Sequence, residues 1–407
     1  MRVGIEVREQ LPQNGGAYTF QSEILEALIA LQGESRHEFR LLPGSPAVEA
    51  SLRSTGIKCA AFPMRTYAAQ RRTRRLRHAL SRFTGEGSGD NDAARAMQIA
   101  ITETAARNEE VEMIWCMSHG TAFFDIPYIT TVWDIEHRNQ PWFPEVSEGG
   151  LWRDREQGFA QDLPRATYVV VGTQVGRGEV ERFYGVPGER VRILPHPTPR
   201  FALEAGAQAG VGAAQRHGLK PGYLLYPAQF WAHKNHVNLL LALKLLKERE
   251  GLAPELALMG SDKGNRAHVE RTIAECGLTG QVKMLGFVPQ EDLVGLYREA
   301  LALSYLSFCG PENMPPLEAF ALGCPVLASR IAGHEEQLGD AALLVDPRDP
   351  ADIGRGIKAL HGDARLREEL SAKGLARARR WTGREFVRGV FALLDEFEPV
   401  RRAWGRD

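Results

Sequence analysis

The segment Ser307–Ser329, SFCGPENMPPLEAFALGCPVLAS, decides the fold of this 407-residue chain. It follows an apolar strand, Ala300–Leu306, and breaks at Gly310-Pro311. A short helix then starts at Pro315-Pro316, where proline fits because the first helical N–H has no partner within the helix. That helix ends at Gly323, and a second apolar strand follows. Such a unit places a helix N-terminus at the carboxyl edge of a parallel sheet, where phosphates bind.

The same alternation of strand and helix runs through the whole chain. Short apolar runs separated by helical stretches predict parallel sheets covered on both faces. The predicted strands are Arg2–Val7, Phe39–Leu42, Ile57–Phe62, Met113–Met117, Tyr128–Trp133, Tyr168–Val171 and Val191–Leu194, then Tyr223–Tyr226, Leu256–Met259, Val282–Leu285, Ala300–Leu306, Pro325–Ala328 and Leu343–Val345. The Ala- and Gly-rich segment Thr198–Pro221 is the predicted linker. We therefore expect an α/β fold of two doubly wound, Rossmann-like domains that face a cleft, the usual ligand site in such folds.

The composition excludes several classes of protein. Apolar content of 43% and charged content of 25% are ordinary for a soluble globular protein. A net charge of −1 gives no electrostatic case for a nucleic-acid partner. The five cysteines contain no CxxC pair, so we expect buried reduced thiols. Neither a signal peptide nor an apolar run of about 18 residues is present, so we expect a soluble, cytoplasmic protein.

The motif around Glu318 resembles the signature of the retaining GT-B glycosyltransferases of family 4 (glycosyl transferases group 1). Leu317-Glu318-Ala319 and Gly323-Cys324-Pro325-Val326 match that signature. The resemblance implies a GT-B fold in which Glu318 holds the ribose hydroxyls of a nucleotide sugar, although position alone only makes this glutamate complementary to the helix dipole. The first glutamate of the family falls on Gly310, and Glu312 is out of register. Asn313 takes a family glycine position, which Asn tolerates better than most residues.

Further segments resemble the donor side of the family. Gly15-Gly16 follows the first strand and would let the backbone approach a diphosphate at a helix start, with a plain tight turn as the alternative. Lys234 matches the family lysine that clamps the diphosphate, a role that suits its point charge, while Gln229 stands at the family arginine. Val288 belongs to the segment that meets the base. The expected donor-binding residues are Gly15, Gly16, Gln229, Lys234, Gly260, Val288, Gly310, Asn313, Met314, Leu317 and Glu318.

Polar residues after the strand Tyr128–Trp133 are candidates for catalysis, because ligands bind at the carboxyl ends of parallel strands. Family members commonly place a histidine at the Trp133 position to touch the donor sugar. Asp134 matches the aspartate that follows it, and His137 is expected to take over the polar contact. The alternative is that Asp134 and His137 brace the loop. The predicted catalytic residues are His137, Asp134 and Lys234, with His119 as a weaker acceptor-side candidate.

Three other segments have competing interpretations. Arg65–Phe83 carries seven arginines and no acid, which predicts either a basic amphipathic helix on an anionic membrane or a solvated face packed on its own domain. Asp90-Asn91-Asp92 matches the metal triplet of GT-A enzymes but lies among Gly and Ser, and no metal site is expected. Trp381–Phe397 is amphipathic. The resemblance implies a helix that crosses back to the first domain, and a partner-binding helix is the alternative.

From these features we expect residues 1–200 to form an acceptor-side domain, residues 201–382 a donor domain, and residues 383–407 the returning helix. The resemblance implies metal-independent, retaining hexosyl transfer from a UDP- or GDP-linked sugar to a saccharide or lipid-linked acceptor, without a cofactor and without nucleic acid. Polysaccharide or lipid-linked oligosaccharide assembly, in the cytoplasm or on the inner face of a membrane, is the expected setting. Because Trp133, Gln229 and Gly310 replace polar family residues, an impaired sugar-nucleotide-binding subunit is one alternative. A GT-B epimerase, which would need an acid/base set at the sugar such as His137 and Asp134, is another.

Overall fold

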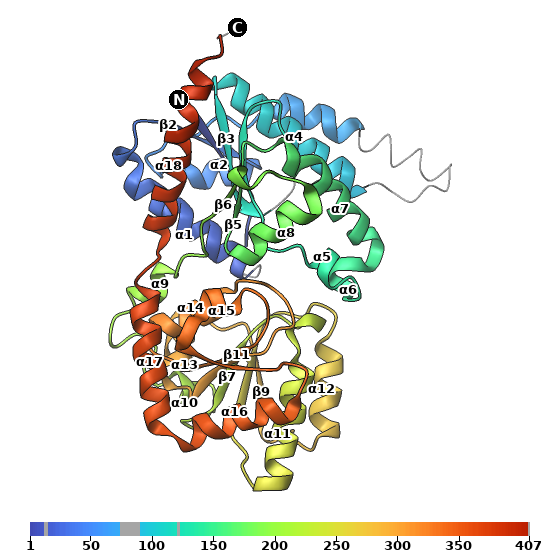
Figure 1. The fold of residues 1–407 in the computed structure, drawn as a ribbon, viewed down its shortest axis with the longest axis vertical. Helices are drawn as coiled ribbons and strands as arrows, with labels where there is room; N and C mark the ends of the chain where they lie inside the picture. The colour runs from blue at the N-terminus through green and yellow to red at the C-terminus, as the bar shows by residue number, and fades with distance from the viewer. Residues whose placement is uncertain (12–14, 74–89, 120–122, 406–407) are drawn as a thin grey trace.

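The computed structural model describes residues 1–11, 15–73, 90–119 and 123–405 and contains two α/β domains, one above the other in Figure 1. Each domain is built on a six-stranded parallel sheet. The expected two-domain α/β, Rossmann-like fold is confirmed. The predicted domain limits at residues 200 and 382 are not tested and stay predictions.

The N-terminal sheet has the order β2-β1-β3-β4-β5-β6, in which the chain reverses direction across the sheet beside β1. Its strands are β1 (Arg2–Val7), β2 (Glu38–Pro43), β3 (Met113–His119), β4 (Tyr128–Thr131), β5 (Tyr168–Val171) and β6 (Val191–Ile193). The helices are α1 (Gly16–Leu31), α2 (Pro46–Leu52), α4 (Asp90–Asn108), α5 (Glu136–Asn139), α6 (Pro144–Ser147), α7 (Leu151–Asp162) and α8 (Gln174–Tyr184), and residues 64–73 are also helical.

The C-terminal sheet has the order β12-β11-β10-β7-β8-β9, the arrangement of a dinucleotide-binding domain. Its strands are β7 (Leu224–Pro227), β8 (Leu256–Met259), β9 (Val282–Gly286), β10 (Ala302–Tyr305), β11 (Val326–Ser329) and β12 (Ala342–Val345). The helices are α9 (Arg200–Leu203), α10 (Ala213–Arg216), α11 (His236–Glu250), α12 (Arg266–Glu275), α13 (Gln290–Glu299), α14 (Met314–Ala321), α15 (His334–Leu338), α16 (Pro350–Gly362) and α17 (Ala364–Ala378).

Helix α18 (Gly383–Arg402) follows the C-terminal domain in sequence but packs on the N-terminal one, beside α1 (Figure 1). A capping box between Thr382 and Glu385 starts the helix. The ring of Phe386 meets the ring of Phe20 edge-on at 5.4 Å, and both side chains belong to the core of the N-terminal domain. The chain thus crosses between the domains twice, and the crossings pair through the Thr198 N–H and the Trp381 carbonyl at 3.0 Å.

Two predictions about elements are wrong. Ile57–Phe62 is not a sheet strand, because only Cys59 bridges to Leu41 and the segment leaves the edge of β2 after two hydrogen bonds. The predicted linker Thr198–Pro221 is not an open connection, since it contains α9 and α10. Short alanine side chains from both helices are buried in the core of the C-terminal domain. From the sequence alone, these alanines could not be told apart from those of a linker.

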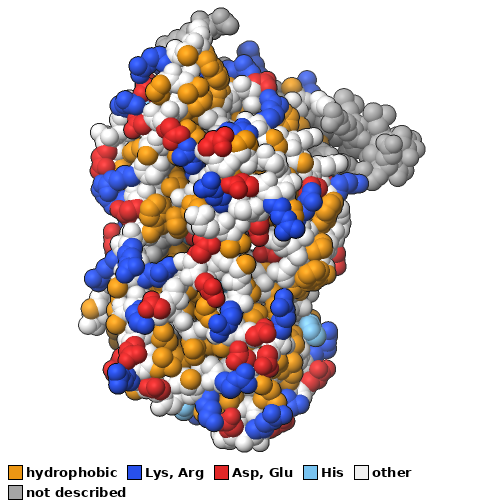
Figure 2. Space-filling model, viewed as in Figure 1, with side chains coloured by type: hydrophobic (Ala, Val, Ile, Leu, Met, Phe, Trp, Pro, Cys, Tyr) orange, Lys and Arg blue, Asp and Glu red, His pale blue; other side chains and the backbone are white. Residues whose placement is uncertain are grey.

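The surface is mixed in charge. On the face shown in Figure 2, acidic and basic side chains alternate over both domains without gathering into one patch. Within the described ranges, no helix combines the length and the apolar character that crossing a membrane requires. Arg65–Phe83 lies outside the described residues from residue 74 onward, so its membrane-facing prediction is untested.

Candidate functional site

A cleft of about 420 Å³ lies between the domains, where loops at the carboxyl ends of both sheets meet. The loops after β1, β4 and β6 line it from the N-terminal side, and those after β7 and β10 line it from the C-terminal side. Of the residues singled out in the sequence, the cleft brings together Gly15, Gly16, Trp133, Asp134, Gln229, Lys234, Gly310, Asn313 and Met314. His137, Gly260, Val288, Leu317 and Glu318 are not among its lining residues.

Helix α1 begins inside this cleft. Gly15 has φ 63° and ψ −125°, a backbone conformation that side-chain-bearing residues rarely adopt. A Cβ built on Gly15 would lie 3.8 Å from Nε2 of Gln229, and one on Gly16 would lie 3.5 Å from Cγ of Met314. The helix N-terminus therefore approaches the opposite domain closely and presents its positive dipole end to the cleft.

Lys234 supplies a positive charge to the cleft. Its Nζ donates to the hydroxyl of Tyr305 at 2.7 Å and to Oδ1 of Asn313 at 3.4 Å. Burial lowers the pKa of this lysine. Both hydrogen-bond partners are neutral, and across the described part of the chain no carboxylate forms an ion pair with Lys234. A partly buried ammonium group without a carboxylate partner is suited to an anionic ligand.

Asn313 orients that lysine through a fixed network. The Nδ1 of His334 lies 2.8 Å from the carbonyl of Ser329, so we assign the proton to this nitrogen and leave Nε2 as an acceptor for Asn313 Nδ2 at 3.0 Å. Burial lowers the pKa of His334 to about 4, so the ring is neutral. Nδ2 of Asn313 also lies 3.0 Å from the carbonyl of Gly310. These bonds turn Oδ1 of Asn313 toward Lys234.

Glu318 lies one helical turn beyond Met314 in α14. The hydroxyl of Tyr297 donates to its Oε2 at 2.7 Å, and burial raises the pKa of Glu318 to about 7. Leu317 and Val288 are buried in the core of the C-terminal domain. Gly260 allows the loop after β8 to approach the loop after β7, because a Cβ here would lie 2.5 Å from the carbonyl oxygen of Ala228.

The two polar residues after β4 have different surroundings. Burial alone would raise the pKa of Asp134, but Arg155, 2.6 Å away, holds it well below the usual range. His137 is fully buried, with Nε2 3.2 Å from Glu156 and 3.1 Å from the hydroxyl of Tyr184. Burial lowers its pKa to about 4. His137 does not line the cleft, and its placement agrees with the alternative of a brace for the loop.

Trp133 occupies the cleft wall with its indole against a histidine. The two rings of Trp133 and His119 are stacked, with centroids 5.4 Å apart and an interplanar angle of 22°. The backbone N–H of Trp133 donates to Nδ1 of His119 at 3.0 Å, and burial lowers the pKa of that histidine to about 4. His119 thus supports Trp133 from behind as a neutral ring.

Four glutamates that the sequence analysis did not assign to the site connect the two domains. We call Glu136, Glu145, Glu312 and Glu336 the bridging glutamates, because each accepts a backbone N–H from the opposite domain. The pairs are Glu136 with Gly310 (3.1 Å), Glu145 with His233 (2.8 Å), Glu312 with His196 (2.8 Å), and Glu336 with Gln174 (2.7 Å) and Val175 (3.1 Å). Their position in the segments that follow strands, three of them in short helices, was the available signal, but the partner across the cleft depends on how the domains are placed.

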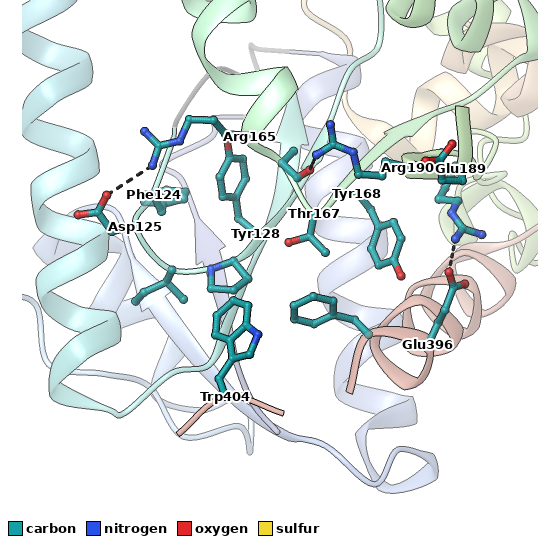
Figure 3. A pocket seen from close by; sticks show the side chains of 15 residues that line it. Phe124, Asp125, Tyr128, Arg165, Thr167, Tyr168, Glu189, Arg190, Glu396 and Trp404 are labelled. Atoms are coloured by element: carbon teal, nitrogen blue, oxygen red, sulfur yellow. Dashed lines mark hydrogen bonds and ion pairs between the residues drawn. The ribbon is translucent and has the colours of Figure 1, made fainter. Parts of the chain in front are cut away.

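A second cavity, of about 520 Å³, lies at the amino ends of β4 and β5 beside Trp404 (Figure 3). Its charges are mutually neutralised, since Arg165 pairs with Asp125 at 3.6 Å and Arg192 pairs with Glu396. Ligands of parallel sheets bind at the opposite, carboxyl edge. We therefore place the functional site in the cleft and not in this larger cavity.

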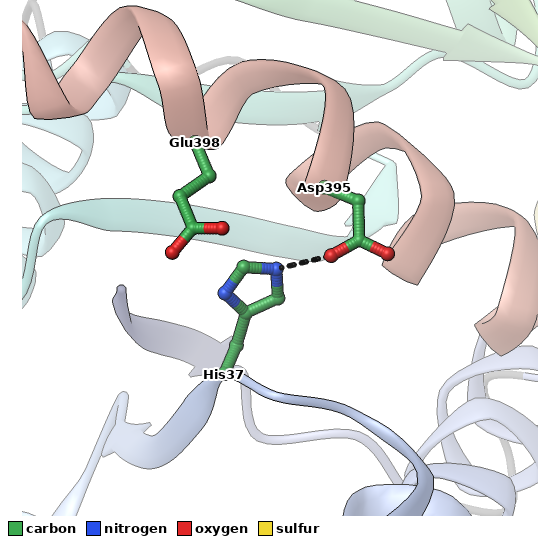
Figure 4. A group of neighbouring side chains, drawn as sticks. All are labelled: His37, Asp395 and Glu398. Atoms are coloured by element: carbon green, nitrogen blue, oxygen red, sulfur yellow. Dashed lines mark hydrogen bonds and ion pairs between the residues drawn. The ribbon is translucent and has the colours of Figure 1, made fainter.

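The side chains of His37, Asp395 and Glu398 also gather closely enough to hold a metal ion (Figure 4). Arg36, however, already forms ion pairs with both carboxylates, at 2.7 and 2.8 Å, and His37 Nε2 lies 3.1 Å from Asp395. This cluster ties the start of β2 to α18. The sequence triplet Asp90-Asn91-Asp92 forms the first residues of α4.

Part of this chain is similar to a family of known proteins. Residues 213–377 match the family model described as glycosyl transferases group 1. The chain is 29% identical to the O-antigen chain mannosyltransferase B of Escherichia coli over 271 residues, which cover 65% of this chain and 70% of that protein. It is 28% identical to the D-inositol 3-phosphate glycosyltransferase of Pseudarthrobacter chlorophenolicus over 233 residues, 56% of this chain and 55% of the relative. The match thus spans little more than half of that second protein.

Solved structures match over almost the whole chain. The sucrose-phosphate synthase of Thermosynechococcus elongatus superposes with a TM-score of 0.73 at 15% identity, covering 98% of this chain and all of that one. The Anabaena protein Alr3699/HepE, crystallised with UDP and glucose, has a TM-score of 0.68 at 15% identity, covering 97% of this chain and all of that one. At this identity the likeness establishes the fold alone.

Proposed function

We propose that this chain, a GT-B glycosyltransferase like those of family 4 (glycosyl transferases group 1), transfers a sugar with retention of configuration from a nucleotide diphospho-sugar to a hydroxyl acceptor. One observation carries the proposal. The ammonium of Lys234 lies in the cleft with only neutral hydrogen-bond partners among the described residues, close to the start of α14 and across from the start of α1.

The diphosphate is the part of the donor that these groups fit. Charge builds on the leaving diphosphate during transfer, and preorganised positive groups stabilise that charge. Lys234 supplies a full charge, and the N-termini of α1 and α14 supply the positive ends of helix dipoles. Gln229 lines the same wall and contributes an amide in place of a second charge. In this proposal no metal ion is required for the leaving group.

Glu318 is assigned to the ribose. Its carboxylate offers four acceptor positions, and the hydroxyl of Tyr297 takes one of them. The loops that contain Gly260 and Val288 would then flank the nucleoside. Asp134 is held ionised by Arg155 and is assigned to the acceptor side of the cleft.

The proposed chemistry needs no dedicated protein base. The acceptor hydroxyl attacks the anomeric carbon from the face that the diphosphate leaves, the glycosidic oxygen forms its bond as the carbon–phosphate-oxygen bond breaks, and a phosphate oxygen takes the acceptor proton. The neutral, buried His137 is left out of this step. Because relatives include a protein named for O-antigen chain mannosyl transfer, we propose a saccharide or lipid-linked acceptor in polysaccharide assembly.

A sugar-nucleotide-binding subunit without transfer activity is the second candidate. The observation that favours it is the loss of polar side chains at Trp133 and Gly310, both of which line the cleft. Such a protein would bind the donor and leave it intact in the presence of acceptors.

Thermal unfolding with a panel of UDP-, GDP- and ADP-sugars, with and without EDTA, tests the donor site. A donor at about one hundred times its Kd should stabilise the protein by about 2.7 kcal/mol. We expect one nucleotide class to raise Tm, EDTA to have no effect, and Glu318→Ala to abolish the shift. Glu335→Ala, an exposed glutamate in α15, is the control and should keep it.

The product assay uses the nucleotide class that the panel selects. We expect transfer to a saccharide acceptor. NMR should show that an α-linked donor gives an α-linked product. Absence of any nucleotide-dependent shift would contradict the donor site, and binding without transfer to a broad acceptor panel would favour the binding subunit.

A further inference from the structure

We propose that Glu136, a residue of the N-terminal domain whose carboxylate contacts Gly310 in the cleft, binds a hydroxyl of the transferred sugar. This inference rests on the proposed donor site and names a specificity-determining residue within it. It assigns to Glu136 a contact with the sugar of the donor and not with the nucleotide.

The contact between Glu136 and Gly310 places the carboxylate at the right point of the cleft. Both residues line the cleft, and Oε1 of Glu136 accepts the Gly310 N–H at 3.1 Å. The two positions are 174 residues apart in sequence, so only the closed arrangement of the domains brings them together. The carboxylate thus contacts the loop that leads into α14, in the cleft that Lys234 also lines.

Gly310 itself cannot carry an acidic side chain without strain. Its φ is +97°, a region that residues with a Cβ rarely adopt. A Cβ built here would also lie 3.1 Å from Nδ2 of Asn313, the residue that orients Lys234. The loop therefore keeps its Asn313 network by having no side chain at position 310, and the carboxylate that contacts this position comes from Glu136 in the N-terminal domain.

Glu136 is the bridging glutamate whose hydrogen-bond partners a sugar can replace. Its donors are the Gly310 N–H and, at 3.1 Å, the amide Nε2 of Gln140, both neutral. By contrast, the carboxylate of Glu312 holds both the backbone N–H and the ring Nδ1 of His196, the latter at 2.7 Å. Glu145 is held by a histidine in the same way, and Glu336 is not among the residues lining the cleft.

The surroundings of Glu136 suit a hydroxyl ligand. Burial raises its pKa to about 7, the hydrogen bond from Gly310 opposes this rise, and the charges of Asp134 and Glu179 add to it. Lys234 and Cys309 of the C-terminal domain lie close enough to Glu136 for its charge to raise their pKa values, although burial, the larger effect, lowers that of Lys234. A carboxyl group with this pKa accepts a hydrogen bond from a sugar hydroxyl when ionised and donates one when protonated. The charged phosphate contact of Lys234 and the sugar contact of Glu136 then come from different domains.

The test compares nucleoside diphosphate with sugar nucleotide on Glu136→Gln, using UDP with UDP-glucose and GDP with GDP-mannose in titration calorimetry. We expect Glu136→Gln to leave the Kd of the diphosphate within about twofold and to weaken the sugar nucleotide by about 10-fold to 100-fold, the range for a hydrogen bond to a charged group. Glu179→Gln is the matched control, since this carboxyl lies nearby, has a raised pKa and does not line the cleft. It should change neither Kd.

Donors that each lack one sugar hydroxyl test the contact directly, because a purely structural role of Glu136 would not change their affinities relative to the complete donor. One deoxy donor should weaken binding to the native protein, and the same loss should be absent in Glu136→Gln, so that the two changes are not additive. Glu136→Asp, which keeps the charge but shortens the side chain, should fall between the two proteins. Unchanged Tm in these variants separates the contact from misfolding.

Each outcome is decisive. Three results would overturn the role of Glu136 but not the donor site. These are an equal loss of diphosphate and sugar-nucleotide affinity in Glu136→Gln, additive effects with every deoxy donor, and full sugar-nucleotide affinity in Glu136→Gln. Failure of the native protein to bind any UDP or GDP compound would overturn the proposed function and this inference together.

Discussion

Single residues in the cleft differ in protonation because of how deeply each is buried and which charge stands beside it. Burial raises the pKa of Glu318 and of Glu136 to about 7, whereas the neighbouring Arg155 holds Asp134 ionised despite its burial. Carboxyl groups whose environments push their pKa values apart can serve different roles in one site. Here Asp134 keeps a fixed charge, and the other two groups change charge near neutral pH.

Glu318 should make nucleotide binding depend on pH. The ribose hydroxyls donate to the ionised carboxylate, so binding requires the loss of a proton from a group whose pKa is about 7. We expect the affinity for UDP or GDP, whichever binds, to rise as the pH increases from about 6 to 8, by at most about tenfold per pH unit below the pKa. Calorimetry across this range measures it, and Glu318→Gln should remove this part of the pH dependence.

The raised pKa of Glu318 also makes the stability of the ligand-free protein depend on pH. Between pH 4.5, its ordinary pKa, and about 7, the folded protein retains a proton on Glu318 that the unfolded chain has lost. Its contribution to the free energy of unfolding is therefore complete below pH 4.5 and is lost as the pH rises through 7. For the binding prediction, the contradicting result is a nucleotide affinity that varies with pH in the same way in Glu318→Gln and in the native protein. It would mean that Glu318 does not bind the ribose as a carboxylate.

Among the elements, α18 makes the N-terminal domain dependent on a segment that lies beyond the other domain. Phe386, Val390 and Leu394 of this helix are buried against the sheet together with residues of α1. The packed rings of Phe386 and Phe20 join the two helices directly. The helix is thus part of the domain core and not a surface attachment.

Phe386→Ala should destabilise the N-terminal domain by about 3 to 5 kcal/mol, because it removes a buried aromatic ring and leaves a cavity. Urea unfolding followed by tryptophan fluorescence, with and without nucleotide, measures the change. Val400→Ala at the exposed end of the same helix is the control and should stay within about 0.5 kcal/mol of the native protein. Equal stability of the two variants would mean that α18 is not part of the core.

The sequence predicted where strands and helices lie far better than it predicted which elements and side chains contact one another. Apolar runs such as Tyr168–Val171 and Leu256–Met259 are strands with the expected limits, because a buried parallel strand has an unambiguous pattern. Ile57–Phe62 is also mostly apolar, apart from Lys58, but it forms a single bridge at a sheet edge, and its composition alone does not reveal this. In the site, Lys234 was predicted from its segment alone, and the structure places it in the cleft. The direction of His137 was not, since its burial depends on α7 and α8, which are distant in sequence.

At the scale of the whole molecule, the bridging glutamates hold the two domains together around the cleft. Each contact joins a carboxylate to a backbone N–H across the cleft, which fixes both distance and orientation. Glu312 fits most tightly, because a Cβ built on Gly172 would lie 1.2 Å from its Oε2. Gly172 therefore sets how closely the loop after β5 and the loop after β10 can approach.

Gly172→Ala should open the cleft, because the added methyl group overlaps the carboxylate of Glu312. If the closed population falls to about one tenth, the apparent Kd for the sugar nucleotide rises about tenfold. Small-angle scattering should show a larger radius of gyration. Gly178→Ala in α8 is the control, since a Cβ there meets no atom within 4 Å.

The double variant Gly172→Ala with Glu312→Ala isolates the cause. Removing the carboxylate relieves the overlap, so the radius of gyration should return toward the native value. An unchanged radius in Gly172→Ala would show that the glutamate moves aside without opening the domains, and persistent opening in the double variant would assign the effect to another contact.

The return of α18 to the first domain also fixes an order of events during protein synthesis. The N-terminal strands leave the ribosome first, yet their core stays incomplete until residues 383–402 have emerged. The second domain contains all strands of its own sheet between β7 and β12 and can close before that point. The domain that is made first is therefore finished last, and until then the apolar face of α1 around Phe20 is open to chaperones.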